Sequence, residues 1–332
     1  MDNDTARVRQ FPGRLRAVTN CGKGRVVIAK PGVLLWLFCL TANAAANAAC
    51  SVDNKATIPL DASGGAITVP VEVNGIAATF ILDTGAQRSV VTPAAVQRLG
   101  LARDEWVGTA MRGVGGIENR PNANPRTLTL GGVNLVRRTV HHDTSLTVGI
   151  LPLTRAGNRV IDGLLGRDFL SLFDLDIDAA AHRLTLFQVQ SCSGRFLPWS
   201  GTYAAVPVTT PAGNAMVVPV TLDGTPLRAL LDTGASASLL AAPGIFRTGL
   251  RQSSLKRDPT DQVSGLGPRT VTMHRHIFRS LQVGGQTIDA PVIWVAPIRL
   301  TPIVDMLLGA DWVASRRVWI SYATRQLFVA TP

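Results

Sequence analysis

The chain has 332 residues, of which 46% are hydrophobic and 17% charged, a balance that excludes an intrinsically disordered protein. Its 31 glycines and 20 prolines, with only 5% aromatic residues, favour short strands joined by turns over long helices. The formal charge of +11 is uneven, because residues 1–50 carry seven basic and two acidic residues and the rest only +6. No basic run is interleaved with aromatic residues, so we expect a charge that serves solubility and no nucleic-acid partner.

The first fifty residues have the order of an export signal. A basic stretch precedes the apolar run VLLWLFCL at 33–40, and small residues with A-x-A spacing follow it. The apolar run is shorter than the ~20 residues that span a bilayer as a helix. We therefore expect an exported protein, periplasmic or secreted, with its signal region at 1–50. The alternative is an uncleaved segment that anchors the chain in a membrane.

Two of the four cysteines, Cys50 and Cys192, would remain after removal of such a signal. In an oxidising compartment they can form a disulfide that ties the start of the mature chain to the junction between its halves. The alternative is that Cys50 is a lipid-modified first residue, although Asn47 stands where such signals usually carry an aliphatic residue. We expect no stable membrane partner unless the signal is uncleaved or Cys50 carries a lipid.

The rest of the chain contains an internal repeat. The segment AITVPVEVNGIAATFILDTGA at 66–86 lies opposite AMVVPVTLDGTPLRALLDTGA at 215–235, and the matched residues are separated by 149. In each segment Asn-Gly or Asp-Gly between alternating apolar residues predicts a two-residue hairpin, whose second strand runs into Asp-Thr-Gly. Further on, VIDGLLGRDFL at 160–170 matches IVDMLLGADWV at 303–313, and a predicted strand pair follows each.

These matches predict an all-β protein made of two similar lobes. We place the first lobe at 51–190 and the second at 202–332, with a linker at 191–201 between them. The segments between the matched motifs differ in length, as loops do when the framework that they connect is the same.

Each Asp-Thr-Gly puts a carboxylate on a tight turn after a strand. Two related lobes packed about a pseudo-two-fold axis would bring Asp83 and Asp232 together, where they would share one proton and supply one acid and one base. The ionised carboxylate would take a proton from water while the protonated one hydrogen-bonds a peptide carbonyl, so neither a metal nor another cofactor is required. The residues expected to support the two aspartates are Thr84, Gly85, Thr233 and Gly234.

With these motifs the chain resembles the retropepsin-like aspartic proteases, the clan that includes retroviral proteases and pepsin. The hydrophobic-Asp-Thr-Gly-Ala signature occurs in both halves, as does the second signature, Leu-Leu-Gly at 164–166 and 307–309. The resemblance implies two β-barrel lobes, a peptide or protein substrate, and glycine-rich flaps over the site. The flap candidates are Gly113, Val114, Gly115 and Gly116, with Gly265, Leu266 and Gly267 as their counterpart. Pepsin's flap tyrosine has no evident match, because the only tyrosines are Tyr203 and Tyr322.

Several other residues could be mistaken for functional groups. Asp162 and Asp305 recur at matching positions, and we interpret them as residues that begin strands or cap turns. The histidines at 141, 142, 274 and 276 have no cysteine or third histidine nearby at zinc-ligand spacing, so we predict surface or strand histidines and no metal site.

Two rival functions remain open at this point. One is a catalytically silent module that keeps the fold as a peptide-binding cleft, and the other is a protease that is active only as a homodimer. The paired aspartates, threonines and glycines argue against the first, and the absence of a long linker argues against the second. We therefore expect a monomeric aspartic endopeptidase. In pepsin-like relatives a serine usually follows each Asp-Thr-Gly and can hydrogen-bond the ionised carboxylate, whereas this chain has Ala86 and Ala235. The resemblance therefore implies raised pKa values for the two aspartates and a pH optimum of activity in weakly acidic solution.

Overall fold

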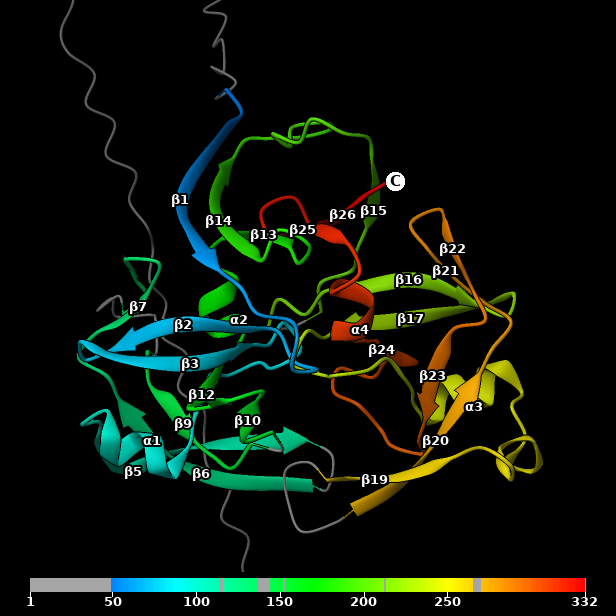
Figure 1. The fold of residues 1–332 in the computed structure, drawn as a ribbon, viewed down its shortest axis with the longest axis horizontal. Helices are drawn as coiled ribbons and strands as arrows, with labels where there is room; N and C mark the ends of the chain where they lie inside the picture. The colour runs from blue at the N-terminus through cyan, green and yellow to red at the C-terminus, as the bar shows by residue number, and fades with distance from the viewer. Residues whose placement is uncertain are drawn as a thin grey trace, which may run out of the picture. The chain divides into compact units, whose positions relative to one another are not determined.

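Each half of the chain forms its own nine-stranded sheet, and a third sheet contains strands from both halves (Figure 1). The computed structural model describes residues 49–113, 116–136, 144–151, 153–211, 213–264 and 270–331. Strands dominate the described residues and the helices are short. The prediction of an all-β protein with two similar lobes is therefore confirmed.

The sheet of the first lobe pairs its strands in an order unlike their order in the chain. From one edge to the other the strands are β5 (Ala102–Gly113), β6 (Gly116–Asn124), β9 (Leu146–Val148), β4 (Val90–Val91), β12 (Gly163–Leu165), β3 (Ile76–Leu82), β2 (Thr68–Val73), β7 (Leu128–Leu130) and β8 (Val133–Asn134). Strand β12 is parallel to β3, and β4 is parallel to β9.

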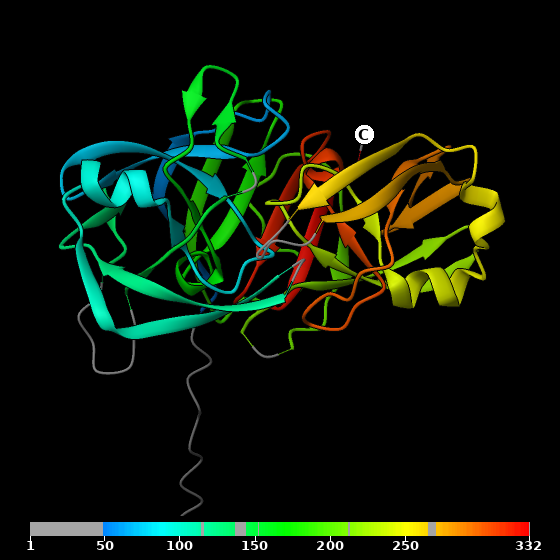
Figure 2. The same cartoon turned by 90° about the horizontal axis from the view of Figure 1, so that it is seen from below.

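The sheet of the second lobe repeats this arrangement strand for strand. Its order is β19 (Thr260–Ser264), β20 (Thr270–Ile277), β23 (Val292–Val295), β18 (Leu239–Leu240), β24 (Met306–Leu308), β17 (Thr225–Leu231), β16 (Val217–Leu222), β21 (Ser280–Val283) and β22 (Gln286–Asp289). The two parallel pairs recur at the same places, between β17 and β24 and between β18 and β23. Figure 2 shows the first lobe in cyan and teal and the second in yellow and orange.

The third sheet joins the two halves. Its order is β1 (Ser51–Pro59), β14 (Arg183–Gln190), β13 (Asp174–Asp178), β25 (Arg317–Ser321), β26 (Gln326–Ala330) and β15 (Tyr203–Pro207). The sequence predicts the hairpins β13–β14 and β25–β26 separately. The antiparallel pairing of β13 with β25, for example Leu175 with Ile320, turns them into one sheet.

The helices are short, and most of them repeat between the lobes. They are α1 (Pro93–Arg98), α2 (Arg167–Leu170), α3 (Ala242–Thr248) and α4 (Ala310–Val313), with a 3-10 helix at Gln252–Leu255. The small hairpin of β10 (Arg155–Ala156) and β11 (Arg159–Val160) belongs to the first lobe. No helix in the described part of the chain is both long enough and apolar enough to cross a membrane.

The predicted hairpin turns are present in both lobes. Asn74 and Gly75 have φ angles of 53° and 79°, and Asp223 and Gly224 have 50° and 84°. Two consecutive positive φ angles define the turn whose twist matches that of the flanking strands. The Asn74 Oδ1 also accepts hydrogen bonds from the backbone of residues 126 and 127, and the Asp223 Oδ1 does so from residues 279 and 280. Each turn therefore also fixes the start of a neighbouring strand.

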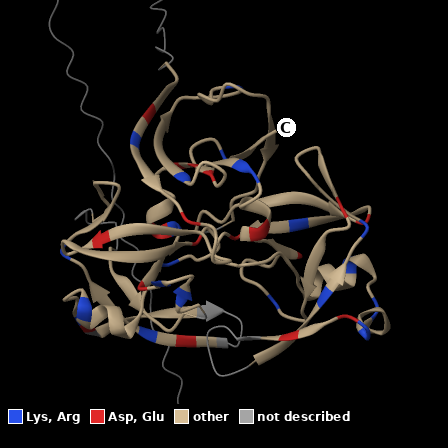
Figure 3. Cartoon of the chain, viewed as in Figure 1, with Lys and Arg blue, Asp and Glu red and all other residues tan. Residues whose placement is uncertain are grey.

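One hydrophobic core runs through both lobes and the shared sheet. It includes Phe80 and Phe169 from the first half and Val218 and Val313 from the second, each at most 1% exposed. The two lobes and the shared sheet therefore have a contiguous main core. Lys and Arg are interspersed with Asp and Glu over both lobes (Figure 3).

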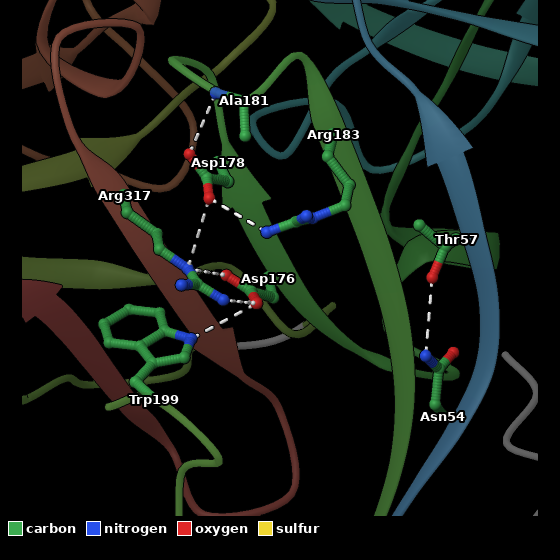
Figure 4. Close-up of polar contacts among 8 residues, drawn as sticks. All are labelled: Asn54, Thr57, Asp176, Asp178, Ala181, Arg183, Trp199 and Arg317. Carbon is green, nitrogen blue, oxygen red and sulfur yellow. Dashed lines mark hydrogen bonds and ion pairs between the residues drawn. The ribbon is translucent and has the colours of Figure 1, made fainter. Parts of the chain in front are cut away.

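The junction between the halves is held by a disulfide and by aromatic side chains. Cys50 and Cys192 are bonded with an S–S distance of 2.09 Å, as predicted, which leaves no thiol at Cys50 for a lipid. Nearby, Arg317 of β25 reaches across to Asp176 of β13 at 2.7 Å, and Trp199 of the linker donates to the same carboxylate (Figure 4). The linker is thus tied to the shared sheet.

Candidate active site

The two Asp-Thr-Gly turns follow directly on equivalent strands. Asp83 comes after β3 and Asp232 after β17. The Asp83 amide donates to Leu165 O of β12 at 2.9 Å, and the Asp232 amide donates to Leu308 O of β24 at 2.9 Å. The Leu-Leu-Gly strands therefore lie beside the aspartate turns.

Each aspartate is oriented by amides of its own turn. Asp83 Oδ1 accepts from the Gly85 and Ala86 amides at 2.9 and 2.7 Å. Asp232 Oδ1 accepts from residues 234 and 235 at 3.1 and 3.2 Å. In both carboxyl groups these contacts hold Oδ1 and leave Oδ2 for another partner.

The glycines of the two turns allow the carboxyl groups to meet. A Cβ added to Gly85 would lie 2.3 Å from the Cγ of Asp232, and one added to Gly234 would lie 2.2 Å from the Cγ of Asp83. Each glycine therefore leaves room for the aspartate of the opposite lobe. The two carboxyl groups lie within hydrogen-bonding reach of each other. Here glycine is required by close approach rather than by its backbone angles.

The threonines bind the two turns across the lobe boundary. Thr84 Oγ1 donates to Leu231 O at 2.8 Å, and Thr233 Oγ1 donates to Leu82 O at 2.5 Å. Each hydroxyl also accepts from the other threonine's amide, at 3.0 and 3.1 Å. Both side chains are fully buried. This reciprocal bonding fixes the separation of the aspartates, because neither turn can move without breaking bonds to the other.

A serine and an aspartate that hydrogen-bond each other support each turn. This pairing was not predicted from the sequence. Ser89 Oγ donates to Asp168 at 2.7 Å and accepts from the Gly166 amide at 2.8 Å. In the second lobe, Ser238 makes the same pair of bonds, to Asp311 and from residue 309, at 2.9 and 3.0 Å. The repeat spacing could have indicated these serines, because they are also separated by 149 residues and each lies six residues after its aspartate.

The electrostatic environment favours a protonated carboxyl group in the pair. Burial raises the pKa of Asp83, and the charge of Asp232 raises it further, against the lowering effect of the two turn amides. Burial also raises the pKa of Asp232, which its own amides, Asp83 and the charge of Arg167 counteract. Because two adjacent carboxyl groups cannot both ionise easily, we expect the pair to lose its two protons in separate steps.

A cavity of about 520 Å³ lies beside the Asp83 turn. Most of its lining is apolar and comes from the first lobe, while Pro211, Thr301 and Pro302 come from the second. The residues of the first lobe that line it are Asp83, Gly85, Ala86, Gln87, Arg88, Val90, Ala110, Met111, Gly149, Ile150, Leu151, Leu164 and Arg167. An extended peptide side chain placed here would lie next to the carboxyl pair.

The flap candidates are only partly described. Gly113 ends β5 and Gly116 begins β6, and the two residues are paired across the hairpin. Met111 of the same hairpin lines the cavity. The candidates Val114 and Gly115, with Gly265, Leu266 and Gly267, lie outside the described residues, so the flap function stays a prediction.

Asp162 and Asp305 are structural, as interpreted from the sequence. Each directly precedes a strand, β12 or β24, and accepts from the backbone of a neighbouring strand, at Thr79 or Arg228. His276 pairs with Asp258 at 2.7 Å, whereas residues 141 and 142 lie outside the described residues. Within the described ranges, no group of three or more His, Cys, Asp or Glu is placed to hold a metal ion.

Comparison with protein families agrees with this geometry. A family model for aspartyl proteases matches residues 69–169 and again residues 218–312. Together the two matches cover more than half of the chain, one in each lobe. The chain therefore belongs to the aspartyl protease family. A search of curated proteins found no similar protein.

Proposed function

We propose that this chain is an aspartic endopeptidase in which Asp83 and Asp232 form a single catalytic dyad within one chain. The observation that carries the proposal is that each aspartate lies against the glycine of the other lobe's turn. A peptide-binding module would need the cavity but not two carboxyl groups oriented by their turn amides. Pairing of both halves in one shared sheet supports activity as a monomer rather than as a homodimer.

The reaction uses one water molecule and the two carboxyl groups of the chain. A water between the carboxyl groups loses a proton to the ionised aspartate and attacks the peptide carbonyl carbon. The protonated aspartate meanwhile donates a hydrogen bond to the carbonyl oxygen. The resulting tetrahedral diol collapses when a proton reaches the amide nitrogen, which breaks the C–N bond and restores the shared proton. The cross-bonded threonines keep the carboxyl groups in register throughout.

The test is cleavage of a diverse peptide mixture by the exported form, read by mass spectrometry, with and without pepstatin. We expect Asp83→Asn and Asp232→Asn each to lower kcat/KM by at least about a thousandfold, because an amide can serve as neither acid nor base. Asp162→Asn is the matched control, since this buried aspartate lies outside the dyad, and it should retain activity. Activity should elute with the monomer on gel filtration.

Substantial activity in either dyad variant would rule out the single-dyad mechanism. Activity confined to a dimer peak would favour the homodimer. Binding of peptides without cleavage would favour the silent module.

We further propose that residues 1–50 direct export and that the mature chain begins close to Cys50. The Cys50–Cys192 disulfide supports this, because such bonds persist in oxidising compartments. N-terminal sequencing of protein from the medium and the cell envelope tests it. Recovery of the full-length chain in the reducing cytoplasm, with both thiols free, would contradict export.

A further inference from the structure

Arg167 has no counterpart in the second lobe, although the backbone around it does. It follows Leu-Leu-Gly in the first repeat, where the second repeat has Ala310. Both residues begin a one-turn helix, α2 or α4. The amide of Arg167 donates to Ala86 O at 2.9 Å, and that of Ala310 donates to Ala235 O at 2.8 Å. The two lobes thus have the same local fold and differ here only in the side chain.

The Arg167 side chain holds the catalytic turn from inside the protein. Its Nη1 donates to the carbonyls of Thr84 and Gly85 at 3.1 and 2.8 Å, and both residues belong to the Asp83 turn. Its Nε donates to Gly213 O at 2.8 Å, in the second half of the chain. The residue is only 4% exposed. A single guanidinium therefore ties the turn of one lobe to a loop of the other.

Among the described residues, no carboxylate lies within ion-pair distance of the Arg167 guanidinium. Its hydrogen bonds all go to carbonyl oxygens. An arginine keeps its positive charge even when buried, and burial of a charge is costly without an opposite charge nearby. Some other group must therefore balance it.

Among the described residues, the titratable groups that act electrostatically on the guanidinium are Tyr322, Asp83, Asp232 and Asp168. Burial raises the pKa of the Tyr322 hydroxyl, so this group is neutral over the working range. Asp168 hydrogen-bonds the amide and the hydroxyl of Ser89 and lies 3.9 Å from Arg88, so it already has a cation. The remaining negative charge is that of the dyad.

We propose that Arg167 is a positioning residue that fixes the Asp83 turn and supplies a buried positive charge opposite the single negative charge of the dyad. This inference rests on the proposed function, because it assigns a role within that same site. A cation favours the ionised form of both carboxyl groups. Loss of the charge should therefore raise both macroscopic pKa values and move the activity profile towards higher pH.

The experiment compares the pH dependence of kcat/KM in three proteins altered at residue 167. Arg167→Gln and a protein with citrulline in place of Arg167 both lack the charge, and citrulline keeps the planar shape and most donors. We expect both limbs of the profile to rise by about one pH unit in each. Arg167→Lys keeps the charge but not the fork of donors, so its limbs should stay near those of the wild type while kcat falls.

The matched control is Arg317→Gln, which removes a partly buried arginine from the shared sheet. It should lower stability and leave both limbs in place, because Arg317 pairs with Asp176 rather than with the dyad. If Arg167→Gln does not fold, the citrulline protein decides. Unmoved limbs in a folded charge-free protein, with Asp-dependent cleavage intact, would overturn this inference alone. Cleavage that does not depend on Asp83 would instead overturn the proposed function.

Discussion

The two lobes share one strand order, yet they surround the dyad with different side chains. In the first lobe Val90 pairs with Thr147, two residues before Gly149 of the cavity wall. In the second, Leu239 pairs with Trp294 at the corresponding place, and Ala296 takes the position of the glycine. There, Trp294 packs against a cluster that includes Leu239, Ala296 and Ile298. Larger side chains thus occupy the equivalent space in the second lobe.

The comparison distinguishes residues that are identical in both lobes from residues that differ between them. The residues that are identical in both lobes, the aspartates, threonines, glycines and bracing serines, build the carboxyl pair. The residues that differ include Arg167 against Ala310 and Gly149 against Ala296, and both Arg167 and Gly149 line the cavity beside the Asp83 turn. We infer that the repeated groups make the chemistry possible, while the unmatched ones set its pH range and substrate preference.

Among the substitutions that test this comparison of the lobes, the largest effect should come from the glycines that both lobes share. Gly85→Ala and Gly234→Ala each place a methyl group within 2.3 Å of the opposite carboxyl carbon, so one aspartate must be displaced. We expect kcat/KM to fall by at least about a hundredfold in both, because a displacement of ~1 Å is enough for such a loss. Peptide cleavage assays with circular dichroism as a check of folding measure it.

Gly75→Ala is the control for the glycine variants. Its added Cβ would meet no atom within 4 Å, although its φ of 79° disfavours alanine. It should therefore lose stability, by about 1 kcal/mol, and retain activity. If only one of the two turn variants lost activity, the lobes would not contribute equivalent halves of the site.

A smaller and one-sided effect is expected at the cavity. Gly149→Val would fill space beside Val90, whose Cγ1 lies 3.1 Å from a Cβ at this position. We expect kcat/KM to fall about tenfold for peptides with a large apolar residue at the scissile bond, and less for those with a small one. Cleavage-site profiling by mass spectrometry measures both classes in one mixture.

Trp294→Ala is the matched change in the second lobe. It should leave cleavage of the same large apolar peptides within about twofold, because Trp294 does not line the cavity. Equal losses in the two variants would show that the lobes bind the substrate symmetrically, which would remove the distinction between their pockets.

The parts of the fold that depend on a local sequence pattern could be predicted from the sequence. Asn74-Gly75 and Asp223-Gly224 have the residue types that a tight hairpin requires, and the repeat offset of 149 aligned both Asp-Thr-Gly turns. The pairing of Cys50 with Cys192 followed from the count of cysteines left after the signal. These features are legible because each is set by a short segment or by a fixed spacing.

Contacts between segments that are far apart in the chain could not be predicted from such local patterns. Leu175 meets Ile320 in the shared sheet although 145 residues separate them, and both segments look like ordinary hairpin strands. Arg167 stood in a recognised motif, but its bond to Gly213 depends on how the second half folds back. The cavity is lined mostly by the first lobe because small side chains there correspond to larger ones at the matching positions of the second lobe. Those positions can be matched only when the strand registers of both lobes are known. These features arise from packing between distant segments rather than from local propensity.

The smallest predicted effect concerns the alanines that follow the two triplets. The amides of Ala86 and Ala235 already donate to the aspartates, and a serine hydroxyl could add one more donor to each ionised carboxylate. Such a bond lowers the pKa, whereas burial in this site raises it. The wild type should therefore work in weakly acidic solution, and Ala86→Ser and Ala235→Ser should each move the profile to lower pH by about half a unit.

Because the protons belong to the pair, either substitution should move the same two limbs of kcat/KM against pH. Ala86→Gly, which adds no donor, is the control. A shift of one limb in one variant only would mean that the aspartates titrate independently, and the shared-proton description of the dyad would then be wrong.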